Sequence, residues 1–139
     1  MERREVVEKL KSFDWEQRGV EFAVLFGSTA RGLAGPLSDV DIAVKGDVDV
    51  VELVLDISSL LDLPEDRVDV VVVNEEMPYS LLRAIAVEGI PVYVKDREAW
   101  RDFVVKALSL YLDFRVFVSK YEIEWVRRFV ENSRSSKSD

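Results

Sequence analysis

The sequence predicts an α+β fold in which a mixed β-sheet carries helices on one face. Four short apolar runs, each bounded by turn-forming or charged residues, are typical of strands that lie in a core. Amphipathic patterns of helical period alternate with these runs. At 139 residues and 48% hydrophobic content, the chain is long enough to bury one core and too apolar to be disordered.

The first part of the chain predicts two helices and two strands. Gly27 ends the first apolar run and Gly46 ends the second, while Gly35 and Pro36 between them form a loop signal. The expected elements are a helix over 2–13, a strand over 20–26, a turn with a short helix that starts at Ser28, and a strand over 39–44.

The middle of the chain predicts a capped helix. Asp49, with Glu52 three residues later, fits a capping box, and Pro64 is expected to end the helix that follows. Capping therefore explains the Asp47-Val48-Asp49 pair better than catalysis does. The elements expected here and beyond are a helix over 50–61, a strand over 67–73, a helix over 79–88 that Gly89 caps, and a strand over 90–94 that Pro91 confines to an edge.

The last third predicts one long helix over 96–132, which extends the domain formed by residues 1–95, and a disordered polar tail over 133–139. One apolar stripe has helical spacing: Trp100, Val104, Ala107, Tyr111, Phe114, Val118, Tyr121 and Trp125. Phe103, Leu110 and Phe117 fall to one side of it. Either the helix bends round its own core or this side is a second interface, with a second copy or a helical partner; the interface is the favoured hypothesis.

The amino-acid composition excludes several kinds of catalytic and metal-binding site. The chain has no cysteine and no histidine, which excludes disulfides, thiolate or imidazole metal sites, and Ser–His triads. Any metal must therefore be held by oxygen, and any base must be a carboxylate, a lysine or a tyrosine. No apolar run is long enough to cross a membrane and no signal peptide is evident, so a cytoplasmic protein that binds no membrane is expected.

The net charge of −8 is unevenly spread. Residues 1–95 hold ten Lys and Arg against nineteen Asp and Glu, a net charge of −9, and residues 96–139 carry +1. Binding to a nucleic-acid backbone needs Lys and Arg to replace counterions, so DNA and RNA are not expected as partners. A nucleotide that arrives with Mg²⁺ remains compatible with this charge.

A turn and the strand after it hold the candidate site. Gly27 and Ser28 end an apolar run; ten residues separate Ser28 from Asp39, and one separates Asp39 from Asp41. Free backbone N–H groups at the start of the short helix suit a phosphate. Asp39 and Asp41 leave the same face of a strand, where they repel each other unless a cation such as Mg²⁺ binds. Alone, Gly27 reads as a turn glycine and Ser28 as an N-cap; with the aspartates, the functional interpretation is favoured.

Two further residues are candidates. Arg31 can either reach the same phosphates or lie solvated on the short helix, and the two interpretations carry equal weight. Asp69 interrupts a run of five valines, where a buried, unpaired carboxylate costs several kcal/mol. A metal ion or a proton to abstract would explain it, and the alternative is a strand too near the sheet edge to be buried.

The segment over about residues 20–94 resembles the DNA polymerase β-like nucleotidyltransferase superfamily, whose signature is G-S-x10-D-x-D. The short chain and the Gly-Ser-Thr-Ala-Arg-Gly sequence at 27–32 resemble most its minimal nucleotidyltransferase (MNT) family, many of whose members are antitoxins of HEPN/MNT toxin–antitoxin pairs. The last third matches only in being helical.

The resemblance implies nucleotidyl transfer with two Mg²⁺ ions. One ion, on Asp39 and Asp41, would bind the triphosphate, with Gly27 and Ser28 at its outer phosphates. The other, shared with Asp69, would activate an acceptor hydroxyl. The implied reaction moves AMP from ATP, or from another NTP, to a tyrosine of a HEPN toxin.

Two other functions stay open. The chain could modify a hydroxyl of a small molecule, as aminoglycoside nucleotidyltransferases do, although the larger acceptor domain usual in those enzymes is absent here. A non-catalytic module that masks a partner is the third hypothesis, and the presence of all three carboxylates counts against it.

Overall fold

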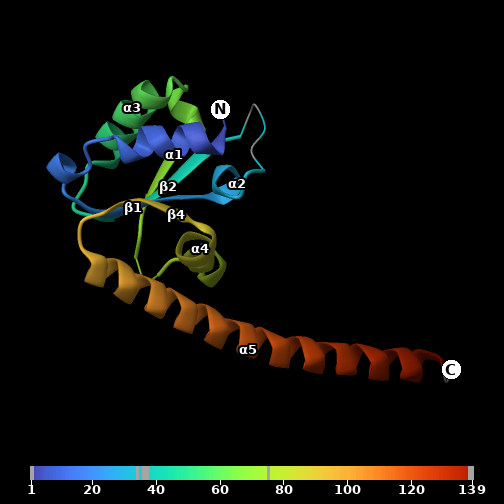
Figure 1. The fold of residues 1–139 in the computed structure, drawn as a ribbon. Helices are drawn as coiled ribbons and strands as arrows, with labels where there is room; N and C mark the ends of the chain where they lie inside the picture. Colours follow the sequence, from blue (N-terminus) through green and yellow to red (C-terminus); the bar gives the residue numbers. More distant parts are fainter. Residues whose placement is uncertain (1, 34, 36–37, 75, 138–139) are drawn as a thin grey trace.

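The structure is a computed structural model that describes residues 2–33, 35, 38–74 and 76–137. It describes the backbone alone for residues 117–119, 121–126, 129 and 132–137. Four strands form one mixed sheet in the order β3-β2-β1-β4 (Figure 1). Their bounds are β1 Val20–Phe26, β2 Val40–Gly46, β3 Val68–Val72 and β4 Ile90–Val94.

The pairing confirms the predicted mixed sheet. β1 pairs antiparallel with β2 and with β4, while β2 pairs in parallel with β3. β4, which contains Pro91, lies at one edge as expected, because proline cannot donate a ladder hydrogen bond. β3 forms the other edge. The predicted bounds match for β1 and β4 and differ by one or two residues for β2 and β3.

Helices pack on both faces of the sheet. One face, as predicted, is covered by α1 (Arg3–Lys11) and α3 (Val50–Leu61). The other is covered by α4 (Tyr79–Arg83), which continues as a π-helical turn over Ala84–Glu88, and by the start of α5 (Arg97–Lys137) (Figure 1). The reason lies in β1, where six of seven residues are buried, so that both of its faces need cover.

Capping at α3 agrees with the sequence. The carboxylate of Asp49 accepts a hydrogen bond from the backbone N–H of Glu52 at 3.2 Å. The helix ends at Leu61, where Asp62 adopts a left-handed conformation with φ 54°, so it stops before Pro64 is reached. Pro64 therefore follows the end of α3 and does not cause it.

We expect Asp49→Ala to lower the free energy of unfolding by about 1 kcal/mol, because one N–H at the start of α3 loses its acceptor. Chemical denaturation measures this loss. Asp47→Ala is the matched control, since Asp47 is exposed and lies outside the helix. Equal stability of the two variants would contradict the capping role.

Gly89 follows the π-helical turn, but not as a left-handed cap. Its backbone is extended, with φ −70° and ψ 157°. A Cβ atom there would lie 2.4 Å from the carbonyl oxygen of Ile85 and 2.5 Å from the side chain of Val24. Glycine is needed at this position for close packing of the π-helical turn against β1.

α5 is one continuous helix, and its second half runs out from the body (Figure 1). The alternative of a bend round the core is therefore wrong. Glycine and proline, the usual causes of a kink, are both absent from α5. Residues 133–137, expected in a disordered tail, continue the helix; Ser138 and Asp139 lie outside the described residues.

The start of α5 belongs to the core. Trp100 and Phe103 both contact Phe22 of β1, with ring centroids 5.1 and 5.4 Å apart, and Ala107 is buried. The assignment of Phe103 to an interface is thus wrong, because residues three apart on a helix can both reach one large ring. Phe117, Val118, Tyr121 and Trp125 have side chains outside the described part.

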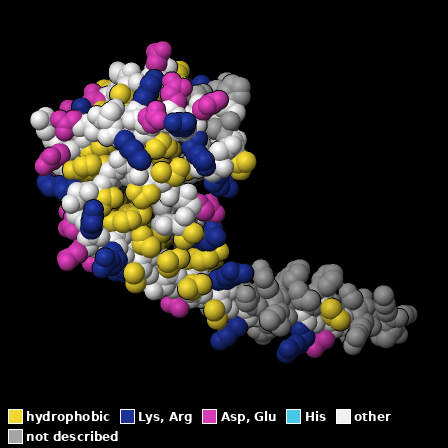
Figure 2. Space-filling model, viewed as in Figure 1, with side chains coloured by type: hydrophobic (Ala, Val, Ile, Leu, Met, Phe, Trp, Pro, Cys, Tyr) yellow, Lys and Arg dark blue, Asp and Glu magenta, His cyan; other side chains and the backbone are white. Residues whose placement is uncertain are grey.

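Beyond Ala107 the described side chains of α5 are more exposed to solvent. Leu112, Phe114 and Val116 are 54, 39 and 58% exposed. Figure 2 shows apolar side chains gathered over the body and along the first part of α5. In the part of the chain that the structure describes, no helix combines the length and apolar character that a membrane span needs.

Candidate active site

The predicted site residues meet where β1 ends and where β2 and β3 begin. In the sheet register Asp41 pairs with Phe26 of β1 on one side and with Asp69 of β3 on the other. Paired residues of neighbouring strands lie about 4.8 Å apart and project from the same face. The carboxylates of Asp41 and Asp69 therefore leave one face of the sheet side by side, on the side that α4 and α5 cover.

Gly27 lies against the carboxylate of Asp41. Its φ of +77° is left-handed, and a Cβ atom there would stand 2.3 Å from Oδ2 of Asp41. The glycine thus satisfies two requirements, a backbone angle that disfavours other residues and the space that the carboxylate fills. The turn predicted from the sequence explains a glycine here, but the contact with Asp41 is seen only in the structure.

Burial and repulsion between neighbouring carboxylates act together on Asp41. Burial, then the nearby carboxylate of Asp69, then that of Asp39, raise the pKa of Asp41 to about 6. Each of these causes disfavours the charged form. A divalent cation would remove the repulsion, and this is the property expected of a metal-binding cluster of carboxylates.

Asp69 is not a buried carboxylate, so that interpretation of it is wrong. Its side chain is exposed, because β3 is an edge strand and the face around Asp69 is open to solvent. The alternative derived from the sequence, a strand near the edge, is therefore the correct reason why a carboxylate is tolerated among valines. What links Asp69 to the site is its position opposite Asp41 and its effect on the pKa of Asp41.

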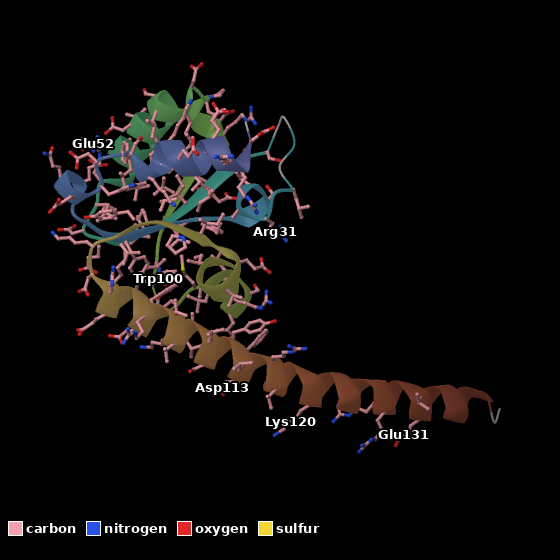
Figure 3. All side chains as sticks on the ribbon, viewed as in Figure 1. Arg31, Glu52, Trp100, Asp113, Lys120 and Glu131 are labelled. Atoms are coloured by element: carbon pink, nitrogen blue, oxygen red, sulfur yellow. The ribbon has the colours of Figure 1, made fainter. Side chains whose placement is uncertain are left out.

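The other candidates lie on or beside α2 (Gly27–Ala30), a single turn that begins one residue before the expected Ser28. Because α2 has four residues, its dipole is small and contributes less to phosphate binding than a full helix would. Ser28 is half-buried and is the second residue of the turn, not its N-cap. Arg31 follows the turn with an exposed side chain (Figure 3), which leaves both of its interpretations open.

Two positioning residues were missed by the sequence reasoning. Thr29 is buried, and its hydroxyl donates a hydrogen bond to the carbonyl oxygen of Asp39 at 3.2 Å, which ties α2 to the start of β2. Arg67 donates to the carbonyl oxygen of Ser38 at 2.9 Å, just before the same strand. The position of Thr29 inside the Gly-Ser-Thr motif could have indicated its role. No feature of the sequence around Arg67 indicated the role of that residue.

The carboxylates fit Mg²⁺ in chemistry, though they do not form a complete cage. Oxygen donors that leave one face of the sheet are what a hard cation needs. A bound cation would also offset the repulsion that helps to raise the pKa of Asp41. Within the described residues no three acidic side chains are arranged to enclose a metal by themselves. Mg²⁺ usually binds one or two carboxylates together with substrate phosphates and water, so the cluster fits an ion that a nucleotide helps to hold.

A family model described as "Polymerase beta, Nucleotidyltransferase" matches residues 8–98, more than half of the chain. The chain belongs to the polymerase beta nucleotidyltransferase family. The match includes the turn, β2, β3 and every candidate site residue, and it supports nucleotidyltransferase activity. No curated protein matches the sequence.

Solved structures of this nucleotidyltransferase fold resemble the chain over nearly its whole length. A mutant of the MntA–HpeT toxin–antitoxin pair has a TM-score of 0.64 and 20% identity, covering 91% of this chain and 99% of that one. A toxin–antitoxin structure with AMP-PNP has a TM-score of 0.62 and 21% identity, with coverage of 91% and 99%. The structure of tri-AMPylated Shewanella oneidensis HEPN toxin in complex with MNT antitoxin has a TM-score of 0.61 and 20% identity, covering 89% of this chain and 98% of that one. At these identities the likeness establishes the fold, including the long C-terminal helix.

Proposed function

We propose that this nucleotidyltransferase uses Mg²⁺ to transfer AMP from ATP to a hydroxyl of a partner protein. The acceptor we propose is a tyrosine of a HEPN-domain toxin, so that the chain acts as an antitoxin. The observation that carries the proposal is the pairing of Asp41 with Asp69 beside Gly27. Relatives of the same fold that form complexes with a HEPN toxin, one with the toxin tri-AMPylated, support this choice of acceptor.

Each residue has a role that follows from its position. Asp39 and Asp41 would hold one Mg²⁺ and share a second with Asp69; bound Mg²⁺ supplies charge neutralisation and a lower pKa for the acceptor hydroxyl. Asp69 is exposed at the sheet edge, where it can accept the proton of that hydroxyl. The hydroxyl oxygen then bonds to the α-phosphorus, and pyrophosphate leaves. The N–H groups at Gly27 and Ser28 would hold the outer phosphates, with Arg31 within reach of them.

A partner surface is available on α5. Its second half leaves the body. Leu112, Phe114 and Val116, which come just before that half, have exposed apolar side chains that support a protein interface. The near-neutral charge of residues 96–139, against −9 for the body, agrees with an interface core. A HEPN protein is the partner we propose; a homodimer stays a prediction.

Transfer is tested with ATP labelled at the α-phosphorus, Mg²⁺ and a purified HEPN-domain protein. Label on a tyrosine of that protein supports the proposal, and ATP labelled at the γ-phosphorus should give none. Label on an aminoglycoside instead would favour the small-molecule alternative. A tight complex that forms without any labelling would favour the masking module.

We expect Asp69→Asn to keep Mg-ATP binding and to lose turnover by about a hundredfold or more, because the acceptor side loses its base while the triphosphate side is intact. Isothermal titration measures the binding and labelled ATP the turnover. Asp66→Asn is the matched control, an exposed aspartate just before β3. Complete loss of Mg-ATP binding by Asp69→Asn would mean that its role is wrong.

A further inference from the structure

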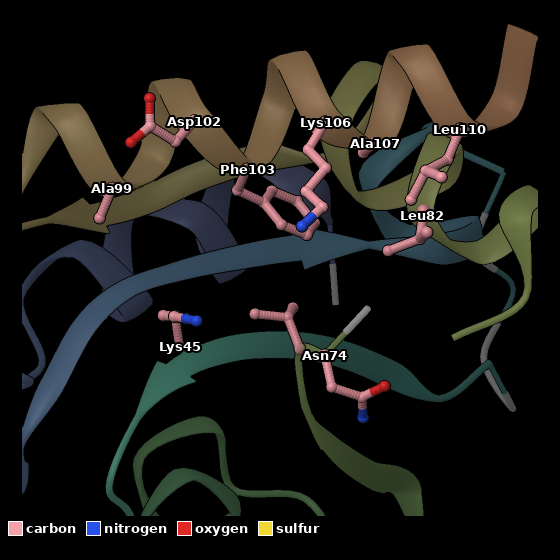
Figure 4. A pocket seen from close by; sticks show the side chains of 10 residues that line it. Lys45, Asn74, Leu82, Ala99, Asp102, Phe103, Lys106, Ala107 and Leu110 are labelled. Atoms are coloured by element: carbon pink, nitrogen blue, oxygen red, sulfur yellow. The ribbon is translucent and has the colours of Figure 1, made fainter. Parts of the chain in front are cut away.

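α5 has two apolar faces, and the body of the molecule covers one of them. Phe103, Ala107 and Leu110 lie on the covered face, where they line a pocket of about 370 Å³ together with Lys45 and Asn74 (Figure 4). About 100° of rotation per residue places positions 105, 112, 116 and 130 on the opposite side of the helix. The apolar side chains at these positions are between 41 and 58% exposed: Val105, Leu112, Val116 and Val130.

The exposed face of α5 follows a heptad repeat. Val105 and Leu112 are seven residues apart, as are Ser109 and Val116, and the two series alternate at spacings of four and three. Apolar residues with this spacing form the contact surface of a two-stranded coiled coil. The series, which we name the outer seam, continues along the helix as Val105, Ser109, Leu112, Val116, Ser119, Ile123, Val126 and Val130.

The second half of α5 needs another helix to pack against. The body contacts the first half, where the ring centroid of Phe114 lies 5.0 Å from that of Tyr79 in α4, and the second half runs out from the body (Figure 1). A helix without tertiary packing is only marginally stable in water, because most helical stability in proteins comes from burial of an apolar face. The outer seam supplies such a face along both halves of α5.

Charges beside the outer seam match a second copy of the chain. Asp113 and Lys120 occupy equivalent heptad positions next to the seam, and both side chains are exposed. In an antiparallel pair with Val105 opposite Val130 of the second copy, Asp113 of each copy lies beside Lys120 of the other. The contact is reciprocal, as the two-fold axis of a homodimer requires. Opposite charges therefore meet twice in this arrangement.

Other arrangements of two copies bring like charges together. A parallel pair in register would place Arg115 beside Lys120 of the second copy. An antiparallel pair shifted by one heptad would place Asp113 opposite Asp113 of the other copy, or Lys120 opposite Lys120, according to the direction of the shift. In the favoured register Lys106 comes near Arg127 of the second copy, but the side chain of Lys106 lines the pocket below α5, which limits this repulsion.

We propose that α5 forms an antiparallel two-stranded coiled coil with α5 of a second copy of this chain, through the outer seam. The proposal does not depend on nucleotidyl transfer. The second half of each α5 packs along the first half of the other, and the two bodies, with their carboxylates, lie at opposite ends of the dimer. Phe114 lies on the other side of the helix from Leu112 and Val116, beside Tyr79, so it stays available to a HEPN partner.

The first test measures the oligomeric state. We expect the wild type to have twice the mass of one chain in light scattering at about 100 μM, since dimer formation follows mass action. Leu112→Glu places a charge in the seam of each copy and should raise the dimer dissociation constant at least about a hundredfold. Val51→Glu is the matched control, because Val51 is 70% exposed on α3, outside α5, and it should leave the dimer unchanged. Circular dichroism checks that both variants stay folded.

The second test fixes the orientation by cross-linking, which is simple because the chain has no cysteine. The double variant Val105→Cys with Val130→Cys should form a disulfide-linked dimer, since the two positions face each other between copies. Neither single variant should do so. At about 1.5 Å per residue, the two copies of position 105 lie about 38 Å apart in the antiparallel pair, too far for a disulfide. A parallel pair would cross-link through each single variant.

Charge reversal tests the register. Lys120→Asp should raise the dimer dissociation constant about fivefold, because Asp113 then faces a like charge in the other copy. Adding Asp113→Lys to this variant should restore the wild-type constant. In a parallel pair Lys120→Asp would instead tighten the dimer, because the new carboxylate would meet Arg115.

Disulfide formation by either single-cysteine variant, or tighter association of Lys120→Asp, overturns the antiparallel arrangement. A wild-type chain that stays monomeric overturns the dimer as a whole. Loss of a HEPN complex in Leu112→Glu would then assign the outer seam to that partner.

Discussion

Asp41→Asn should abolish nucleotidyl transfer and, at the same time, stabilise the metal-free protein. Transfer should fall by about three orders of magnitude, since several kcal/mol of charge stabilisation depend on an ion that Asp41 would hold. Asparagine keeps the shape and removes the charge that Asp39 and Asp69 repel. Labelled ATP measures the first effect and thermal unfolding the second.

The gain in stability has a defined pH dependence. The folded-state pKa of Asp41 is raised to about 6, so the native protein binds the proton more tightly than the unfolded chain does. Its ionisation therefore costs stability, and the cost grows as pH rises from about 4 through 6. We expect Asp41→Asn to gain on the order of 1 kcal/mol at pH 8, after allowance for solvent screening, and little at pH 4.

Mg²⁺ and a second aspartate supply the controls for this prediction. Mg²⁺ should raise the melting temperature of the wild type at pH 8 more than at pH 5, and should have less effect on Asp41→Asn. Asp47→Asn belongs to the other Asp-x-Asp pair and is exposed, so it should keep full transfer. Undiminished transfer by Asp41→Asn would remove the basis for the site.

Gly27→Ala should be among the most damaging substitutions of a single small residue. The left-handed backbone angle costs about 1–2 kcal/mol for alanine, and the new methyl group would stand 2.3 Å from Oδ2 of Asp41. The carboxylate or the turn has to move, which adds about 1–3 kcal/mol of overpacking. Because the displaced group is the proposed metal ligand, we expect transfer to be lost even where the protein remains folded.

Two variants separate these causes. Gly35→Ala is the matched control, since none of the described residues places an atom within 4 Å of its added Cβ; it should change stability by less than about 0.5 kcal/mol. In an Asp41→Ala background, Gly27→Ala should lose only the backbone part of its cost. If the cost is the same in both backgrounds, the contact with Asp41 is not the cause.

The local elements were predictable because they depend on neighbouring residues. The Asp49 cap, the Pro91 edge strand and the apolar run of β1 each carry their cause within a few positions of the chain. The structure differs from the predictions at positions where packing between distant segments determines the role of a residue. Phe103 belongs to the core because Phe22 is placed under it, and Gly89 is required by Val24 and Ile85.

The sequence by itself determined the mixed sheet, most of its strands and helices, and the motif that joins Gly27, Ser28, Asp39 and Asp41, because period, caps and spacing are local properties. Only the tertiary structure decided that Asp69 pairs with Asp41 and is exposed at an edge, since strand order and register are set by contacts across the sheet. It also decided that the start of α5 packs on the same side of the sheet as the carboxylates and lines a pocket with Lys45 and Asn74, at the other end of β2 and β3. A helix pattern states which residues share a stripe, but the sheet against which the stripe packs lies elsewhere in the chain.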